Sequence, residues 1–138
     1  MEEDKIFINC EREDEAYPGY ARKIPINVIC KYAKSICKLT VKDDILGTGF
    51  FMCLCDTYDN QRKRKCLITN YHVISQDLVD LKKNIKIQLE NKKERTIILD
   101  SDKRFIKCFD KLDITIVEII DTDDLINLDI LFLSYKKW

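Results

Sequence analysis

The chain has 138 residues, of which 46% are hydrophobic and 35% are charged. This length suits a single domain, and the hydrophobic content excludes a disordered chain. Lys and Arg together number 24, as do Asp and Glu, so the net charge gives no attraction to nucleic acid or to an anionic membrane. We therefore expect one folded domain that binds neither nucleic acid nor membrane.

The N-terminal sequence is acidic, and its one apolar run is Ile6–Ile8, so it lacks the basic start and the apolar core of a secretory signal. No segment approaches the roughly 18 consecutive apolar residues of a membrane-spanning helix. These features predict a soluble, cytoplasmic protein.

Residues 1–22 combine acidic charge with a Pro-Gly pair and show no hydrophobic period. We expect them to form a mobile tail ahead of a domain at residues 23–138. The apolar residues that follow Pro25 recur at helical spacing and predict a short helix. They are Ile26, Ile29, Cys30 and Ala33.

From Ser35 onward the hydrophobic period changes to two, which indicates a half-buried strand. Further apolar or β-branched segments follow, and one of them, Ile45–Cys55, is apolar at nearly every position and is expected to be buried on both faces. Most connections are too short for the crossovers of a parallel sheet. The sequence therefore predicts an all-β fold, a six-stranded antiparallel β-barrel with a short N-terminal helix. The six predicted strands are residues 35–42, 45–55, 65–74, 84–90, 95–100 and 113–120.

The sequence also predicts the structure of three further segments. Residues 56–65 end in a basic run and are interpreted as a solvated hairpin loop rather than a phosphate site. Residues 75–83 are expected to form a turn of helix capped by Ser75, with Leu78 and Leu81 facing inward. The segment Leu125–Leu133 is too apolar to remain exposed, so it should pack on the barrel or on a second molecule.

The cysteines favour reduced thiols, most of them in the core, because their number is odd and no C-x-x-C pair occurs. A zinc site would need about four ligands, and the chain has a single histidine, so we expect no metal. The seven cysteines are Cys10, Cys30, Cys37, Cys53, Cys55, Cys66 and Cys108.

His72 is the only histidine, and it is therefore the simplest candidate for a general base near neutral pH. Taken alone, however, a histidine beside a strand is more often a structural residue. Two glycines, Gly47 and Gly49, interrupt an apolar strand upstream, where glycine marks a bend or the close approach of another backbone. Asp113 stands at the mouth of an apolar strand downstream, as a catalytic carboxylate or as a charged strand-start residue.

Three motifs at these residues resemble chymotrypsin-type serine proteases, in particular their trypsin-like and HtrA-like branch. Gly47–Phe50 (GTGF) is similar to the G-[ST]-G-F strand of that family. Thr69–Val73 (TNYHV) is similar to the segment that bears the catalytic base, and Asp113–Val117 (DITIV) to the strand that bears the triad aspartate. The motifs occur in the family's order, with 25 residues from Gly47 to His72 and 41 from His72 to Asp113, and the resemblance covers residues 35–120.

The resemblance implies the N-terminal barrel of a trypsin-like peptidase. In that family a histidine takes the proton of the nucleophile, and a carboxylate holds the imidazole in the required tautomer. His72 would be the base and Asp113 its orienting carboxylate, with Asp110 a weaker candidate because it is separated from the apolar strand. Such a domain acts on a protein or peptide and uses no cofactor.

The family's nucleophile has no counterpart in this sequence. It lies in a G-[DN]-S-G-G loop, and the only glycines here are Gly19, Gly47 and Gly49. Ser134 has no neighbouring glycine and is interpreted as structural, and Cys108 precedes the aspartate. Two functions remain open. In the first, the chain is the His/Asp half of a serine peptidase, inactive alone, either as a truncated gene product or as one half of a site completed by a second chain. In the second, it is a non-catalytic protease-like barrel that binds proteins. A third interpretation is an unrelated β-barrel whose motifs match by accident.

Overall fold

The structure, a computed structural model, describes residues 7–11, 21–41, 45–55 and 63–134. The chain divides into two units, Met1–Ala33 and Lys34–Trp138, which are described one after the other. Within the described residues, no helix is long and apolar enough to cross a membrane.

The first unit contains an antiparallel pair of strands followed by a helix. β1 (Phe7–Glu11) pairs with β2 (Ala21–Pro25), where the sequence predicted a tail without strands. The other residues of that tail, 1–6 and 12–20, lie outside the described residues. α1 (Ile26–Ala33) begins directly after Pro25, as predicted, because the proline ring fixes φ near the helical value.

The second unit is built on one antiparallel sheet of seven strands in the order β7-β6-β3-β4-β5-β9-β8, and a two-residue strand, β10, pairs parallel to β4. Two short helical turns, η1 (Asp110–Leu112) and η2 (Asp121–Asp123), flank β9. The strands are β3 (Ile36–Val41), β4 (Ile45–Cys55), β5 (Lys63–Thr69), β6 (Asn84–Leu89), β7 (Glu94–Ile98), β8 (Ile106–Phe109), β9 (Ile114–Glu118) and β10 (Leu133–Ser134).

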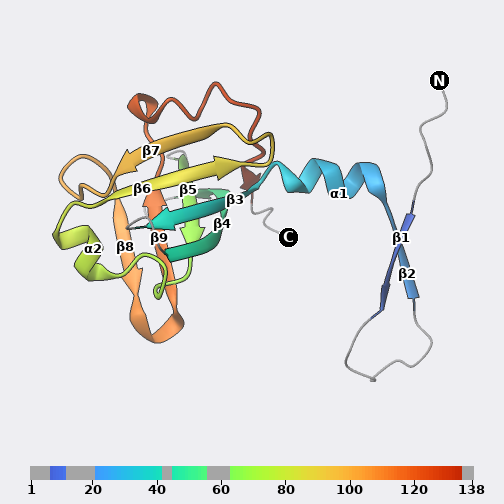
Figure 1. Cartoon of the computed structure of the whole chain (residues 1–138), viewed down its shortest axis with the longest axis horizontal. Helices are drawn as coiled ribbons and strands as arrows, with labels where there is room; N and C mark the ends of the chain where they lie inside the picture. The colour runs from blue at the N-terminus through green and yellow to red at the C-terminus, as the bar shows by residue number, and fades with distance from the viewer. Residues whose placement is uncertain (1–6, 12–20, 42–44, 56–62, 135–138) are drawn as a thin grey trace. The chain divides into compact units, whose positions relative to one another are not determined.

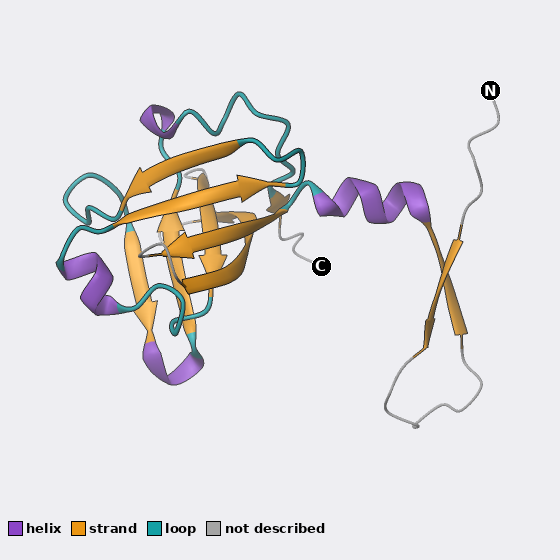
Figure 2. Cartoon of the chain, viewed as in Figure 1, coloured by secondary structure: helices purple, strands orange, loops and turns teal. Residues whose placement is uncertain are grey.

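The sheet is curled into a half-barrel (Figure 1). β4 is its longest strand, and it pairs with β3 through its first half and with β5 through its second. Figure 2 shows the consequence: β3, β6 and β7 run across the direction of β5, β8 and β9. The predicted six-stranded closed barrel is therefore corrected to seven strands and an open sheet, because β8 adds a strand and the end strands β7 and β8 do not pair with each other.

The core lies on the inner face of the curled sheet. In β3 the alternate residues Cys37, Leu39 and Val41 are buried, as the period of two predicted. β4 departs from the prediction of burial on both faces: Phe51 points into the core, whereas Phe50 remains 37% exposed on the outer face. The apolar residues on the outer side of β4 are therefore not all buried, although the sequence predicted that they would be.

Two segments close the open side of the core. α2 (Gln76–Asp80) follows Ser75, which makes no side-chain cap hydrogen bond, and buries Leu78 and Val79. The predicted inward position of Leu81 is wrong, since Leu81 is 63% exposed beyond the end of the helix. The segment 125–133 packs on the sheet, as predicted: Leu125 is buried, and the residues packed against the core are Ile126, Leu128, Ile130 and Phe132.

A buried ion pair fixes the start of this C-terminal segment. Arg104 donates to both carboxylate oxygens of Asp123 at 2.6 and 2.7 Å, and the two side chains are 5% and 4% exposed. The same guanidinium donates to the carbonyl of Glu118 at 3.0 Å. The turn after β9 is thus tied to the residues that lead into β8.

The basic run corrects the predicted loop at residues 56–65. Residues 56–62 lie outside the described part of the chain, whereas Lys63, Arg64 and Lys65 belong to β5 and pair with the end of β4. Arg64 forms an ion pair with Glu118 at 3.1 Å. These side chains are therefore held on a strand, and one of the three charges has an acidic partner.

Candidate functional site

His72 lies in a tight turn between the end of β5 and α2. The turn is closed by the carbonyl of Asn70, which accepts hydrogen bonds from the backbone N–H of Val73 at 3.0 Å and of Ile74 at 3.1 Å. β5 ends at Thr69, so the strand predicted for residues 65–74 stops before the histidine. His72 is therefore presented at the end of the sheet rather than within it.

Asp113 lies at the matching end of the neighbouring strand. β5 and β9 are antiparallel, and Thr69 lies opposite Thr115, so the end of β5 and the start of β9 meet. Asp113 precedes β9 and adopts a left-handed conformation (φ 53°, ψ 44°), which aspartate tolerates better than most residues. The sequence predicted Asp113 as the first strand residue; the turn instead directs its carboxylate toward the histidine.

The predicted contact between His72 and Asp113 is confirmed. Nδ1 of the ring lies 2.9 Å from Oδ2 and 3.1 Å from Oδ1 of the carboxylate. The backbone N–H of His72 also donates to Oδ1, at 3.0 Å. Main chain and side chain of the histidine are thus bound to one carboxylate, which fixes the position and the orientation of the ring.

The protonation state of this carboxylate decides the tautomer of the ring. The backbone N–H of His72 lowers the pKa of Asp113 below its ordinary value, and the histidine side chain and the backbone of Tyr71 act in the same direction. At neutral pH the carboxylate is therefore ionised and can only accept hydrogen bonds. Nδ1 must carry the proton, and in the neutral ring Nε2 is left with its lone pair free to act as a base.

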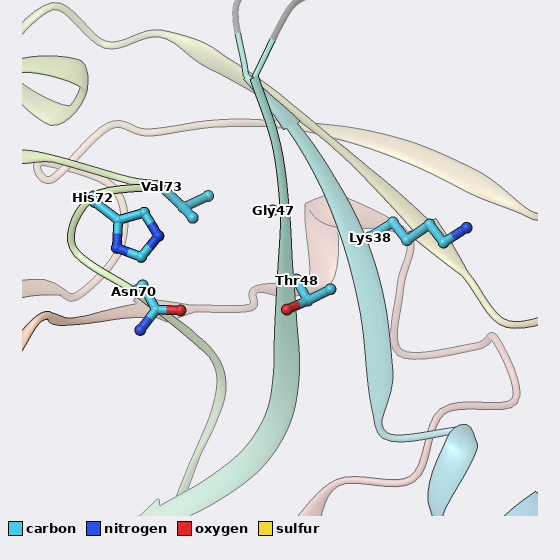
Figure 3. Close-up of a pocket in the computed structure, with 6 residues that line it drawn as sticks. All are labelled: Lys38, Gly47, Thr48, Asn70, His72 and Val73. Carbon is cyan, nitrogen blue, oxygen red and sulfur yellow. The ribbon is translucent and has the colours of Figure 1, made fainter.

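The free side of the ring faces an open hollow of about 360 Å³. Figure 3 shows one ring nitrogen of His72 turned toward the strand that carries Gly47 and Thr48. The imidazole is 70% exposed, and Nε2 forms no hydrogen bond with any described residue. The residues that line the hollow are Lys38, Gly47, Thr48, Asn70, His72 and Val73.

The glycine at position 47 allows the histidine turn to approach β4. A Cβ atom on Gly47 would lie 2.6 Å from both methyl groups of Val73, well inside van der Waals contact. Val73 is 4% exposed and belongs to the core. The sequence predicted a bend or the close approach of another backbone at these glycines; at Gly47 the close neighbour is instead a side chain, that of the residue next to His72.

Two buried threonines hold the same turn from either side. Thr115 is fully buried and donates its hydroxyl to the carbonyl of Ile74 at 2.7 Å. Thr69 donates to the carbonyl of Thr48, also at 2.7 Å. The two hydroxyls therefore bind the ends of the turn to β9 and to β4.

An apolar row crosses the outer face of the sheet beside the hollow. Ile36, Phe50, Ile68 and Ile116 are successive register partners on β3, β4, β5 and β9. Ile36 is 51% exposed and Phe50 37%. Since Phe50 lies two residues from Thr48 on the same strand, this row, which we call the outer apolar row, borders the surface that carries His72.

The described residues do not place a nucleophile against His72. No serine, threonine or cysteine in this part of the chain is hydrogen bonded to the ring. Ser134 lies in β10, paired with β4. Asp110, the weaker candidate, binds the backbone N–H of Lys111 at 2.8 Å and so belongs to the η1 turn.

Six cysteines have free thiols, and fewer of these six are buried than predicted. They are Cys30, Cys37, Cys53, Cys55, Cys66 and Cys108. Cys37 and Cys66 are buried, whereas Cys30 and Cys55 are exposed. Burial raises the pKa of Cys37 and Cys66 to about 12, so neither is a thiolate at neutral pH. Within the described residues, no group of three or more potential metal ligands occurs.

Asn70 is the residue of the site that the sequence analysis did not single out. Its amide nitrogen lies 3.3 Å from the carbonyl oxygen of Asp113 and 3.3 Å from its Oδ2. Asn70 belongs to the TNYHV motif, but no local pattern indicates its contact with a residue 43 positions away.

Comparisons of the chain with models of known families, with curated proteins and with solved structures found no match.

Proposed function

We propose that this chain supplies the general base and the orienting carboxylate of a trypsin-like serine peptidase. The observation that carries the proposal is the His72–Asp113 pair, with Nδ1 bound to an ionised carboxylate and Nε2 open to a hollow. The three motifs that resemble this family contribute to that one site: His72 and Asp113 form the pair, and Gly47 makes room for the turn that holds it.

The proposed chemistry is hydrolysis of a peptide bond. Nε2 of His72 takes the proton of a serine hydroxyl while the serine oxygen bonds to the scissile carbonyl carbon. The imidazolium then gives this proton to the amine nitrogen as the C–N bond breaks, and the acyl group stays on the serine. Asp113 remains ionised throughout and stabilises the charged ring. In the second half, water attacks the acyl carbon while Nε2 takes a proton from it, and the imidazolium gives that proton to the serine oxygen as the ester bond breaks.

The serine would come from polypeptide outside the described residues, as the second barrel provides it in the family that the chain resembles. The outer apolar row supports contact with a further protein surface, because exposed apolar side chains in a row are typical of interaction sites. Its members Ile36 and Phe50 lie two residues along β3 and β4 from Lys38 and Thr48, which line the hollow in front of His72.

The test is to express the tagged chain in its natural host cells, purify it with its bound proteins and treat the material with a fluorophosphonate probe, which labels activated serines. We expect a polypeptide that the probe labels to co-purify with the wild-type chain and with Lys93→Ala, a control substitution at an exposed position. The same polypeptide should co-purify with the His72→Ala variant, but the probe should not label it. Absence of any His72-dependent labelling would overturn the proposal.

The second candidate, a non-catalytic protease-like barrel that binds proteins, is favoured by the same outer apolar row. It predicts a bound polypeptide that no fluorophosphonate labels and whose association does not change in His72→Ala. A Phe50→Asp substitution tests whether the association is specific. Under either function it should release the partner, and it should leave the inner core intact. A polypeptide that stays bound to this variant would be associated non-specifically.

A further inference from the structure

We infer that Asn70 is a positioning residue that holds the Asp113 carboxylate in register with the His72 ring. The inference deepens the proposed function and concerns the same site. Its basis is that one amide group contacts both the main chain and the side chain of Asp113.

The orientation of the Asn70 amide follows from its partners. Both atoms at 3.3 Å are acceptors, a carbonyl oxygen and an oxygen of an ionised carboxylate. Only the NH₂ end of the amide can donate to them. The amide has two hydrogens, so each acceptor receives one.

The hydrogen bonds of the carboxylate divide between its two oxygens. Oδ1 accepts the backbone N–H of His72 at 3.0 Å, and Oδ2 is the nearer acceptor of the ring Nδ1 at 2.9 Å. The amide nitrogen of Asn70 also donates a hydrogen bond to Oδ2. The amide therefore resists rotation of the carboxyl group, and such a rotation would withdraw Oδ2 from Nδ1.

Asn70 also couples this carboxylate to the histidine turn through its main chain. Its carbonyl accepts the N–H of Val73 and of Ile74, which closes the turn around His72. Its side chain binds Asp113, whose left-handed backbone places the carboxylate beyond the end of β9. Asn70 therefore helps to position Asp113 through its side chain and His72 through its main chain.

The functional consequence is control of the ring tautomer. While Oδ2 faces Nδ1, the proton stays on Nδ1 and Nε2 is the basic atom. If the carboxylate turns away, the Nε2–H tautomer becomes populated, and that form cannot take a proton from a nucleophile in the hollow. Since a hydrogen bond typically changes an equilibrium by roughly 2- to 10-fold, loss of Asn70 should change the tautomer ratio by about that factor.

The experiment measures the tautomers directly on the full chain, by ¹⁵N NMR of the His72 ring at a pH where the ring is neutral. In the wild type we expect Nδ1–H to dominate. Asn70→Ala should increase the Nε2–H population, and Asn70→Asp should increase it further, because it keeps the shape of Asn70 but replaces both donors with a like charge. Asn70→Ser, which retains one donor, should restore part of the wild-type ratio.

Asn91→Ala is the matched control, since it removes an exposed asparagine that caps the N–H of Lys93 far along the sequence from the site. Thermal unfolding of all variants shows which of them fold. A wild-type tautomer ratio in folded Asn70→Asp would overturn the inference. This readout needs no nucleophile or substrate, so its outcome is independent of the fluorophosphonate experiment: a changed ratio without any labelled partner supports the role of Asn70 and counts against the peptidase.

Discussion

Gly47 and Val73 lie so close that a single methyl group on the glycine would come within 2.6 Å of the valine side chain. We therefore expect Gly47→Ala to push the histidine turn away from β4 and to reduce the free energy of unfolding by about 1–3 kcal/mol. Val73→Ala in the same chain removes the clashing methyl groups and should recover part of the loss. Urea denaturation of the wild type, the two single variants and the double variant measures the coupling free energy between the two positions. If the two changes in unfolding free energy simply add, the direct contact is contradicted.

Gly49 faces the core from the same strand. A Cβ atom there would lie 2.8 Å from Leu67 Cδ1 and 3.1 Å from the carbonyl oxygen of Ile68. Gly49→Val should destabilise the fold by about 1–3 kcal/mol, since packed neighbours must move. Thr48→Val, on the exposed outer face, is the control with little expected effect. Equal denaturation midpoints for the parent and Gly49→Val would refute this prediction.

Asp113 should make stability depend on pH in the acidic range. Its pKa is lowered in the folded chain, so its stabilising contribution is present above the ordinary value of 3.8 and is lost as the pH falls through the lower folded value. The difference in unfolding free energy between wild type and Asp113→Asn should therefore shrink as the pH falls below about 5.

The variant His72→Ala distinguishes the causes of that shift. The backbone N–H at position 72 is the largest of them, and it survives the substitution. We expect His72→Ala to retain part of the pH dependence, whereas Asp113→Asn should show none from this site. Denaturation curves measured from pH 2.5 to pH 6 test both statements.

The Arg104–Asp123 pair should matter far more to stability than the surface pairs. Asp123→Ala leaves a buried guanidinium without its carboxylate, at an expected cost of about 3–5 kcal/mol. Asp129→Ala breaks the exposed pair with Lys34, at 2.8 Å, and should cost far less, because water and salt screen exposed charges. Similar losses in the two variants, measured by chemical denaturation, would show that burial does not set the strength of these pairs.

The purified chain alone should have no serine-peptidase turnover. In a triad, loss of the nucleophile costs about as much as loss of all three members. Wild type and His72→Ala should therefore give the same background with a fluorophosphonate probe and with a peptide library. Labelling or cleavage that depends on His72 in the pure chain would reveal a nucleophile within it.

Local patterns were sufficient to predict much of the sheet. The alternation of Cys37, Leu39 and Val41 with polar residues marks β3, because side chains of a strand point alternately to its two faces. The four-residue strand Ile106–Phe109 was missed, since so short a segment carries almost no period of its own. Its pairing with β9 is a tertiary contact, and the count of strands was wrong for that reason.

The part of the site that lies in recognisable motifs could be predicted from the sequence. The resemblance to a protease family predicted a contact between His72 and Asp113, and the structure confirms that contact. The role of Asn70 and the left-handed turn at Asp113 depend on how two strand ends meet across the sheet. Neither follows from the identity of neighbours in the sequence.

The open sheet leaves two end strands, β7 and β8, whose outer backbone groups have no strand partner in the described part of the chain. Such edges can recruit strands from other molecules and begin aggregation. β8 has only four residues and carries the exposed Lys107, and β7 begins with the exposed Glu94. Shortness and charge make both edges poor templates for intermolecular pairing.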